Sequence, residues 1–357
     1  MRAALALGRR GLGNTWPNPA VGAVIARDGV VCGRGWTQPG GRPHAETEAI
    51  RRAGALASGG TLFTTLEPCS HHGKTPPCAD AIIAAGLARV VAAIEDPNPE
   101  VAGQGHARLR AAGIRVDIGL CAREALRDHS GHIHRVREGR PHVTLKLALS
   151  ADGKVAGPGR TRVAITAEPA NSHVHMMRAQ HDAILVGIGT VLADDPLLTC
   201  RLPGLDARSP VRVVLDSDLR LPVSSRLVGT ARETPVWVFA GAHAPQARQE
   251  ALAGAGVEIA RIAPDRTPPA LPAVLAAMAA RGITRVLIEG GPTVATAAVR
   301  ARTVDEFVLL QGSAAIGAGG RDPFDGLTLE AALALGRLSE RETVALGGDR
   351  MTIYGSA

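Results

Sequence analysis

The stretch TLFTTLEPCSHHGKTPPCADAIIAAG, residues 61–86, decides the fold class of the first part of the chain. It opens with a run of apolar and β-branched residues, which is typical of a buried strand. Residues 79–85 have the composition of a helix and end at Gly86, a residue common just after helices. Between the strand and the helix lie Cys69 and Cys78, each preceded by a proline. A strand, a cysteine-bearing loop and a helix in this order predict an α/β unit.

Working outward, strand-like and helical runs alternate over the first 120 residues. We expect a hairpin around Asp28-Gly29, because Asp-Gly between apolar runs is a hairpin signal. The other expected elements are strands at 90–94 and 114–118, and helices at 1–10, 44–53 and 105–112. This alternation predicts an α/β sandwich with a partly parallel sheet.

The pattern starts again around residues 138–141, where we place a boundary between a domain at 1–140 and a domain at 141–357. The second domain repeats the alternation of short apolar strands and helical stretches, so it is predicted to be α/β as well. Its strands are expected at 142–149, 184–186, 211–215, 236–239, 285–288 and 307–310, and its helices at 168–179, 245–253, 269–281 and 293–301.

Composition narrows the class of protein. The chain has 357 residues, 45% of them hydrophobic, and lacks an apolar run long enough to span a membrane as a helix. Without a signal-peptide pattern at the N-terminus, we expect a cytoplasmic protein. Five cysteines in such a protein do not indicate a disulfide framework.

The net charge of +7 invites comparison with nucleic-acid-binding proteins. However, aromatic residues make up only 2% of the chain, so few bases could be stacked, and the basic residues are scattered arginines with only three lysines. A basic balance equally suits a small phosphorylated substrate. We therefore expect a small-molecule partner, with no nucleic acid and no membrane, and leave homo-oligomer formation open.

The sequence predicts a catalytic zinc site formed by His44, Cys69 and Cys78. One imidazole and two thiolates are three protein ligands, and they leave a fourth tetrahedral position for water. Glu46 lies two residues from His44, where it can face that water without being a ligand. The pattern His-x-Glu followed by Pro-Cys is the signature of zinc-dependent base deaminases, although eight residues separate the two cysteines here instead of two.

Two other interpretations of these residues stay open. The cysteines could simply be buried near a helix-start histidine, but that leaves the joint pattern unexplained. A structural zinc site using His71 or His72 would leave Glu46 without a role. Cys32, Cys121 and Cys200 are expected to be buried or incidental.

Four segments of the first domain resemble the family of bifunctional deaminase–reductases of riboflavin biosynthesis: TWPNPAVGAV (15–24), PHAETEAI (43–50), TLEPCSHHGKTPPC (65–78) and EDPNPEVAGQG (95–105). The long insert between the cysteines is characteristic of that family. The resemblance implies a three-layer, cytidine-deaminase-like domain that removes a ring amine from a diaminopyrimidinone bearing a phosphoribosylamino group.

The resemblance also implies roles for individual residues of this domain. One zinc ion would be held by His44, Cys69 and Cys78, with Glu46 as the proton shuttle. Substrate contacts would come from Asn18, Lys74, Asp96 and Asn98. Amides and a carboxylate can pair with a pyrimidine edge, and a lysine can meet a phosphate. The alternative is turn formation, since Asn-Pro and Asp-Pro commonly start turns.

The second domain contains no Rossmann fingerprint, because Leu192 stands where its third glycine would be. Four other segments resemble the reductase half of the same family: residues 145–154, 178–201, 211–217 and 287–297. That resemblance implies a dihydrofolate-reductase-like fold, NADPH as cofactor, and reduction of the ribosyl group of the deaminated product to a ribityl chain.

Residue roles for the reductase are likewise carried over by resemblance. Lys146 and Glu289, expected at strand ends, are candidates for acid/base support. The cofactor would contact Ala148, Ala164, Thr190, Asp194, Ser217, Gly291, Pro292, Thr293, Val294, Ala295, Thr296 and Ala297. The substrate would contact Arg162, Arg178, Leu198, Arg201 and Glu289, with the guanidinium groups of Arg178 and Arg201 suited to its phosphate. Asp194 could instead belong to a helix stop and turn.

One segment departs from the family pattern. Residues 159–166 read GRTRVAIT, with Val163-Ala164 where the family has Trp and Thr161 or Arg162 where it has Ser. Backbone contacts to the cofactor could survive this change, but ring stacking could not. This departure leaves one alternative to the bifunctional enzyme, a deaminase with an inactive reductase-like domain. The basic net charge leaves a second, a zinc deaminase acting on nucleic acid.

Overall fold

The computed structural model of this protein describes residues 1–71, 73, 76–262 and 270–356. The chain forms two compact units. The first consists of Met1–Pro141 with Ala279–Thr284, and the second of His142–Met278 with Arg285–Ala357. Within the described ranges, none of the helices is long and apolar enough to cross a bilayer.

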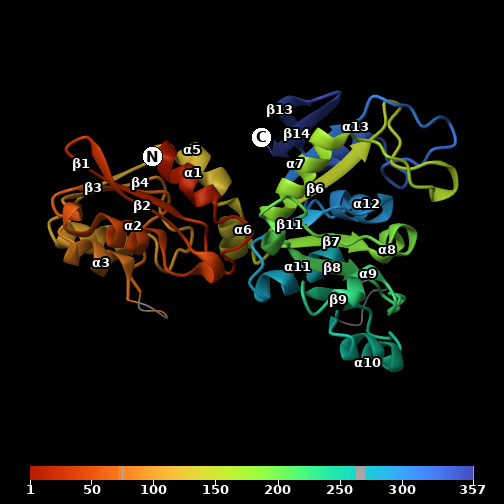
Figure 1. The fold of residues 1–357 in the computed structure, drawn as a ribbon, viewed down its shortest axis with the longest axis horizontal. Coiled ribbons are helices and arrows are strands. Elements are labelled where there is room, and N and C mark those ends of the chain that lie inside the picture. Colours follow the sequence, from red (N-terminus) through yellow and green to blue (C-terminus); the bar gives the residue numbers. More distant parts are fainter. Residues whose placement is uncertain (72, 74–75, 263–269, 357) are drawn as a thin grey trace. The chain divides into compact units, whose positions relative to one another are not determined.

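The first unit (red to dark yellow in Figure 1) is an α/β fold around one sheet of strand order β2-β1-β3-β4-β5. Strand β1 pairs antiparallel with β2 and with β3, whereas β3, β4 and β5 run parallel to one another. In chain order the elements are α1 Arg2–Arg9, β1 Gly22–Arg27, β2 Val30–Trp36, η1 Pro39–Gly41, α2 Ala45–Ala53, η2 Gly54–Ala57, β3 Thr61–Thr64, α3 Cys78–Ala84, β4 Arg89–Ala92, α4 Gln104–Ala111, β5 Arg115–Ile118, α5 Ala122–Asp128 and α6 Ser130–Glu138.

Two local signals of the sequence act as predicted. Asp28 and Gly29 join β1 to β2 with φ of 50° and 78°, and two positive φ values fit the type I′ turn that two-residue hairpins favour. Gly86, at φ 68°, follows the end of α3 and adopts the left-handed conformation that glycine tolerates best. The predicted hairpin and helix end are therefore confirmed.

Two glycines of β2 set the distance between the sheet and helix α2. Gly33 and Gly35 are both buried on the strand face that α2 covers. A Cβ atom added to Gly35 would overlap the carbonyl oxygen of Ala45, and one added to Gly33 would overlap that of Ala49. The helix that follows His44 therefore lies directly on the strand backbone, which no other residue type would permit.

The second unit is built on a sheet that has nine strands among the described residues, in the order β10-β9-β8-β7-β11-β6-β12-β14-β13. From β10 to β12 all neighbours are parallel, and β12, β14 and β13 are antiparallel. Its elements are β6 His142–Leu149, η3 Pro158–Arg160, α7 Glu168–Ala179, β7 Ala183–Gly187, α8 Ile188–Asp194, η4 Asp206–Arg208, β8 Val211–Leu215, α9 Arg226–Gly229, β9 Val236–Ala240, α10 Gln246–Gly254, β10 Glu258–Arg261, α11 Leu271–Ala280, β11 Arg285–Ile288, α12 Pro292–Arg300, β12 Glu306–Gln311, α13 Leu329–Gly336, β13 Leu338–Leu346 and β14 Asp349–Ser356.

The parallel strands of this sheet place their carboxyl ends at one edge. Strands β8, β7, β11 and β6 are consecutive neighbours, with Ile288 of β11 opposite Leu145 of β6. The segments that leave these strands therefore meet at the same edge of the sheet, which is where open α/β sheets bind ligands. Most of the residues predicted for the reductase lie on these segments.

Several elements were not predicted from the sequence: α5, α6, α8, α13, β10 and the hairpin of β13 and β14. Strand β13, LSERETVAL, is mostly exposed on both faces, so it lacks the alternation that identifies a half-buried strand. Helix α8 begins one residue after β7 ends, which leaves no loop signal between them. The formation of these helices and strands depends on tertiary packing rather than on a local sequence pattern.

Replacing Gly35 by Ala should destabilise the first unit by about 1–3 kcal/mol, because the added methyl group forces α2 away from β2. It should also weaken metal binding, because α2 starts next to His44. Chemical denaturation and zinc titration would measure both effects. Arg34→Ala is the matched control, since Arg34 lies between the two glycines and is exposed. Equal stability of the two variants would contradict the packing role of Gly35.

Candidate active sites

Three side chains of the first unit converge on one point. His44 is the N-cap of α2, Cys69 follows β3, and Cys78 is the first residue of α3. The Nδ1 atom of His44 lies 3.3 Å from Sγ of Cys78 and 3.7 Å from Sγ of Cys69. Around a tetrahedral zinc ion, nitrogen and sulfur ligands are about 3.6 Å apart. The donor set and its spacing therefore fit zinc.

His71, one of the alternative zinc ligands, is not part of this cluster. Among the described residues, the group of His, Cys, Asp and Glu side chains close enough to share a metal consists of His44, Cys69 and Cys78. His71 is exposed, and His72 lies outside the described residues. Three ligands rather than four leave room for a water molecule, as catalytic zinc sites do.

The electrostatics of the two sulfur atoms differ. The pKa of Cys69 is lowered to about 4, first by the hydrogen bond from the Cys78 thiol and further by His44 and the backbone N–H of Cys78. That N–H lies 3.2 Å from the Cys69 sulfur. The pKa of Cys78 is raised because the same hydrogen bond and burial favour its thiol form. Metal ligation requires deprotonated sulfur, and Cys69 already meets that condition at neutral pH.

Glu46 lies in the first turn of α2 and is buried, with 3% of its surface exposed. Burial raises its pKa to about 7, because the charged carboxylate is poorly solvated there. It is not a member of the metal-binding cluster. A carboxyl group of this kind beside the zinc ligands can both take up and release a proton near neutral pH.

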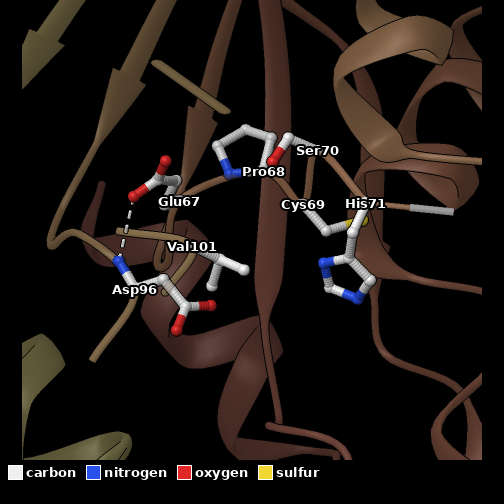
Figure 2. A pocket seen from close by; sticks show the side chains of 7 residues that line it. All are labelled: Glu67, Pro68, Cys69, Ser70, His71, Asp96 and Val101. Atoms are coloured by element: carbon white, nitrogen blue, oxygen red, sulfur yellow. Dashed lines mark hydrogen bonds between the residues drawn. The ribbon is translucent and has the colours of Figure 1, made fainter. Parts of the chain in front are cut away.

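The cavity beside Cys69 is lined by residues from two loops (Figure 2): Glu67, Pro68, Cys69, Ser70, His71, Asp96 and Val101. Of the predicted substrate contacts, Asp96 lines this cavity. Its Oδ1 also accepts the backbone N–H of Asn98 at 2.9 Å, and the Asn98 side-chain oxygen accepts that of Glu100 at 3.1 Å. Both residues thus also form turns, the alternative raised by the sequence. Lys74 lies outside the described residues.

Asn18, the remaining predicted substrate contact of this unit, faces the turn before His44. Its Nδ2 donates to the carbonyl oxygen of Gly41 at 2.9 Å. Gly41 has φ of 85° and no room for a Cβ atom, which would clash with the Asn18 amide. The amide is therefore fixed on the segment that leads into α2.

In the second unit, Glu289 is the centre of a buried ion-pair cluster. Arg178 of α7 donates from Nε to Glu289 Oε1 at 2.7 Å and from Nη2 to Oε2 at 2.9 Å. Lys146 Nζ lies 3.8 Å from the same Oε2. Glu289 directly follows β11, while Lys146 lies within β6 rather than at its end, which corrects the expected position. Pairing of β11 with β6 brings the two residues together.

The charges of Glu289, Arg178 and Lys146 shift one another's pKa values. Burial alone would raise the pKa of Glu289, but Arg178 and Lys146 outweigh it and hold that pKa at about 2. Burial lowers the pKa of Lys146 below its ordinary value, with Glu289 opposing the shift. Glu289 is consequently an anion at neutral pH and cannot donate a proton there, whereas Lys146 can.

The cluster has two basic neighbours: Arg201, which the sequence predicted, and His175, which it did not. The backbone N–H of Arg201 donates to Nδ1 of His175 at 3.3 Å, and His175 lies one helical turn before Arg178 on α7. Burial first, and then the charges of Arg178 and Arg226, lower the pKa of the Arg201 side chain. The spacing of His175 and Arg178 on one helix face is the signal that could have identified His175.

The predicted cofactor residues at the start of α12 lie close to Thr190 of α8. A Cβ atom on Gly291 would lie 3.5 Å from the Thr190 hydroxyl, and one on Gly290 would crowd Val294. Thr293 Oγ1 donates to Asp325 Oδ2 at 2.8 Å, and the Asp325 backbone N–H donates to Thr296 Oγ1 at 2.7 Å. Asp325 is therefore a further residue at this helix end that sequence reasoning missed.

The other predicted reductase residues are more dispersed. Ala148 lies on the same face of β6 as Lys146, and Ser217 follows β8 at the carboxyl edge of the sheet. Asp194 is the last residue of α8, where Asp195 at φ 39° ends the helix, and so it does form the helix stop. Leu198 is buried with φ of 56°. The side chains of Arg162, Ala164 and Arg201 belong to exposed residues, as do those of Asp194, Thr293 and Ala297.

Two protein families match this chain. Residues 1–94 match the cytidine and deoxycytidylate deaminase zinc-binding region. Residues 141–350 match the RibD C-terminal domain.

Individual relatives match over nearly the whole chain. The riboflavin biosynthesis protein RibD of Bacillus amyloliquefaciens is 44% identical over 307 residues, which cover 86% of this chain and 82% of the relative. A solved structure of Acinetobacter baumannii RibD is 36% identical, with a TM-score of 0.87 and coverage of 100% of this chain and 97% of that one. A Thermotoga maritima diaminohydroxyphosphoribosylaminopyrimidine deaminase/5-amino-6-(5-phosphoribosylamino)uracil reductase is 34% identical, with a TM-score of 0.86 and the same coverage.

Removing one sulfur ligand tests the metal site directly. Cys69→Ala should lower the zinc content of the purified protein from one ion per chain to nearly none, because two ligands hold zinc poorly. Metal analysis by mass spectrometry would measure it. Cys32→Ala is the control, since Cys32 lies on β2 and donates to the carbonyl oxygen of Ile25 at 3.5 Å, away from the cluster. Full zinc content in Cys69→Ala would rule out this ligand set.

Proposed function

This chain belongs to the RibD family of riboflavin biosynthesis proteins, and we propose that it deaminates and then reduces one phosphorylated pyrimidine. The first substrate is 2,5-diamino-6-(5-phosphoribosylamino)pyrimidin-4(3H)-one. We assign the zinc-dependent deaminase to residues 1–140 and the NADPH-dependent reductase to residues 141–357. The observation that carries the proposal is the convergence of His44, Cys69 and Cys78 next to the buried Glu46.

In the deaminase, zinc held by these three ligands supplies a Lewis acid that makes water nucleophilic at neutral pH. Glu46 removes a proton from the attacking water and delivers a proton to the departing amine. The ring carbon thus loses ammonia and gains the oxo group. Because Glu46 is buried, the carboxyl group is withdrawn from bulk solvent while it carries the proton.

Other residues of the first unit hold the pyrimidine in place. We assign this role to Asn18, Asp96 and Asn98, whose amide and carboxylate groups can pair with a pyrimidine edge. The location of Asp96 in the wall of the cavity beside Cys69 supports the assignment. Lys74 is assigned to the phosphate by the same family resemblance.

In the reductase, NADPH held by the cofactor residues assigned below would provide the hydride needed to reduce the ribosyl group at C1′. The bond between C1′ and the ring oxygen breaks, and that oxygen takes a proton to become a hydroxyl group of the ribityl chain. Lys146 is the candidate donor, because Glu289 is held as an anion by Arg178 and Lys146. Glu289 instead can accept hydrogen bonds from sugar hydroxyls.

The phosphate of the second substrate would bind the basic groups around this cluster. Arg178 uses Nε and Nη2 on Glu289 and Nη1 on the carbonyl oxygen of Thr199, so it is largely engaged within the protein. Arg201, with an exposed side chain, is the better candidate for phosphate. We therefore assign Arg178 to positioning Glu289 and Arg201 to the phosphate.

The cofactor is assigned to Ala148, Ala164, Thr190, Asp194, Ser217 and residues 291–297. The lack of a Trp in residues 159–166 supports a second candidate, a deaminase with an inactive reductase half. Against it stands the complete Lys146–Glu289–Arg178 cluster, in which the acid/base candidates are paired and largely withdrawn from solvent. NADPH oxidation with the deaminated substrate distinguishes the two candidates: the bifunctional enzyme oxidises NADPH, and a deaminase with an inactive reductase half does not.

The partner and the location follow from this proposal. A small phosphorylated substrate accounts for the basic balance of the chain, so no nucleic acid is required. We propose that the enzyme acts in the cytoplasm.

Glu46→Gln should reduce ammonia release by about 10²–10⁴-fold, because an amide cannot shuttle protons. Zinc content and NADPH oxidation with the deaminated substrate should stay as in the wild type. Glu48→Gln, on the same helix and paired with Arg51 and Arg52 instead, is the control and should retain activity. Residual ammonia release within a few-fold of the wild type would exclude Glu46 as the shuttle.

The pH profile of NADPH oxidation tests the role of Lys146. A donor must be protonated, so the rate should fall as pH rises through the lowered pKa of Lys146, below its ordinary value of 10.5. Glu289, with a pKa of about 2, should contribute no change above pH 5 or so. Lys146→Arg should be slow and should lose the alkaline decline, because a guanidinium keeps its proton.

The matched control for this profile is Lys154→Met. Lys154 pairs with Asp322 at 2.7 Å, away from the cluster, so the variant should keep the wild-type profile. An alkaline decline that survives in Lys146→Arg would assign the titrating group elsewhere.

A further inference from the structure

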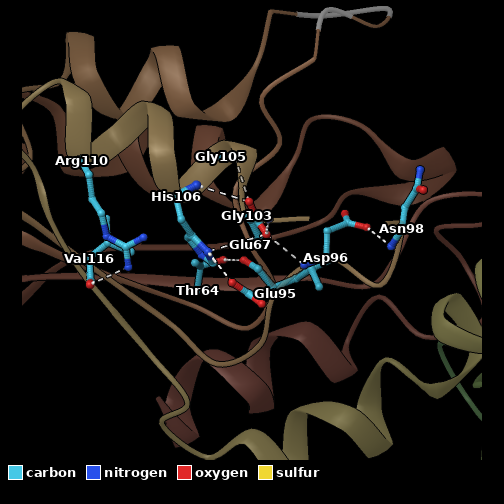
Figure 3. Close-up of polar contacts among 11 residues, drawn as sticks. Thr64, Glu67, Glu95, Asp96, Asn98, Gly103, Gly105, His106, Arg110 and Val116 are labelled. Atoms are coloured by element: carbon cyan, nitrogen blue, oxygen red, sulfur yellow. Dashed lines mark hydrogen bonds and ion pairs between the residues drawn. The ribbon is translucent and has the colours of Figure 1, made fainter. Parts of the chain in front are cut away.

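The buried carboxylate of Glu67 is the meeting point of two loops (Figure 3). Its Oε2 accepts the backbone N–H groups of Asp96 at 3.0 Å and Gly103 at 2.9 Å. Its Oε1 accepts those of Gly105 at 2.8 Å and His106 at 3.3 Å. The side chain is 2% exposed, so these N–H groups replace the water that would otherwise solvate the charge. None of the steps assigned above uses Glu67.

These four contacts close the loop of residues 96–103 at both ends. Asp96 is its first residue and Gly103 its last, and both are bonded to the same carboxylate oxygen. Within the loop, Asn98 is held by its turn with Asp96, and its carbonyl oxygen accepts the N–H groups of Val101 and Ala102. A loop fixed at both ends on one anion has little freedom to change the position of Asp96.

The same carboxylate also caps helix α4. The N-cap residue is Gly103, which has no side chain to accept the N–H groups of the second and third residues of the helix. Glu67 supplies that acceptor from a distant part of the chain, to Gly105 and His106. Gly105 permits the approach, since a Cβ atom there would overlap the carbonyl oxygen of Pro68.

The other end of the connection is the zinc site. Glu67 lies two residues before the ligand Cys69, at the end of the segment that leaves β3. Glu67, Cys69 and Asp96 all line the same cavity, and Figure 2 shows Glu67 bonded to the backbone of Asp96 across it. One side chain thus ties the loop that bears a metal ligand to the loop that bears a substrate-binding carboxylate.

We propose that Glu67 is a positioning residue of the deaminase, which fixes the Asp96 loop relative to the zinc ligand Cys69 and so determines how tightly the pyrimidine binds. The inference rests on the proposed function, because it takes Asp96 and Asn98 as substrate contacts. Glu67 itself does not touch the reacting atoms. It acts through the four backbone N–H groups that its carboxylate accepts.

The test is Glu67→Gln in the full-length, zinc-loaded protein. The amide has the same shape, but its NH₂ group would face two backbone donors, so the loop and the start of α4 should loosen. We expect KM for the diaminopyrimidinone to rise about 10- to 100-fold, because a displaced loop no longer holds Asp96 where it can pair with the pyrimidine. The kcat value, the zinc content of one ion per chain and the reductase rate with deaminated substrate should change little.

A direct readout follows the loop rather than the reaction. Hydrogen exchange of the amides of Asp96, Gly103, Gly105 and His106 should accelerate in Glu67→Gln. Glu100→Gln is the matched control, because Glu100 lies within the same loop and is exposed. It should leave KM and exchange as in the wild type.

A second substitution, at the start of α4, should disrupt the same contact between Glu67 and the helix. Gly105→Ala pushes the start of α4 away from Pro68, so it should also raise KM. Since both substitutions remove one interaction, the double variant should be no worse than the more affected single one. Fully additive effects would show that Glu67 and Gly105 act separately and would overturn the proposal.

The remaining outcomes are equally decisive. A wild-type KM in Glu67→Gln, or loss of zinc together with activity, overturns the proposal, the second because Glu67 would then support the metal ligand instead. If Glu67→Gln does not fold, Glu67→Asp is measured in its place. It keeps the charge with a shorter reach, and a wild-type KM would again contradict positioning.

Asp96→Ala and Asn98→Ala are measured alongside, to test the proposed substrate contacts separately. If both keep the wild-type KM while exchange accelerates in Glu67→Gln, the substrate roles fail and the link between Glu67 and the loop stands.

Discussion

The deaminase centre depends on how closely helix α2 can approach strand β2. His44 and Glu46 belong to the start of that helix, so their positions follow its axis. Gly33 and Gly35 remove every side-chain atom between the strand and the helix backbone. Because the interior of a protein is packed without spare volume, a shift of the helix cannot be absorbed locally. The zinc ligand from α2 and the two from the segment after β3 meet only at this spacing.

Both units place charged side chains out of water, and each charge has its partners in place. In the first unit, Glu67 is surrounded by backbone N–H groups. In the second, Glu289 lies between Arg178 and Lys146. A buried charge without partners would cost several kcal/mol, so such groups hold their neighbours in a defined arrangement. These interactions contribute to the positions of the side chains more than to the free energy of unfolding. Removing one partner of a buried pair leaves the other charge buried without compensation, which is itself destabilising.

The sequence predicted most of the helices and strands that carry the site residues, and few of those that lie further from the sites. The hairpin at Asp28-Gly29, the strand predicted at 61–66 and the helix before Gly86 have strong local signals, and the structure confirms them, with the strand ending at Thr64. The β13–β14 hairpin has none, because β14 is held by pairing with β12, and β13 by pairing with β14, rather than by an apolar pattern of their own. Among the site residues, Glu67 and Asp325 escaped prediction because each acts through residues far away in the chain, whereas His175 has a local signal in its spacing from Arg178.

By itself, the sequence determined the chemistry of this protein: the metal-binding residue types, the carboxyl group two residues from His44, and the two successive α/β patterns. Residue type and short spacing are local properties, and they suffice to identify a donor set. Only the tertiary structure decided which groups are charged and what they hold. The anionic state of Glu289 depends on Arg178 of α7 and on Lys146, which the pairing of β11 with β6 brings to it, and the role of Glu67 depends on N–H groups 29 to 39 residues away along the chain. Electrostatic interactions act through space, so they are fixed only once the fold has brought their partners together.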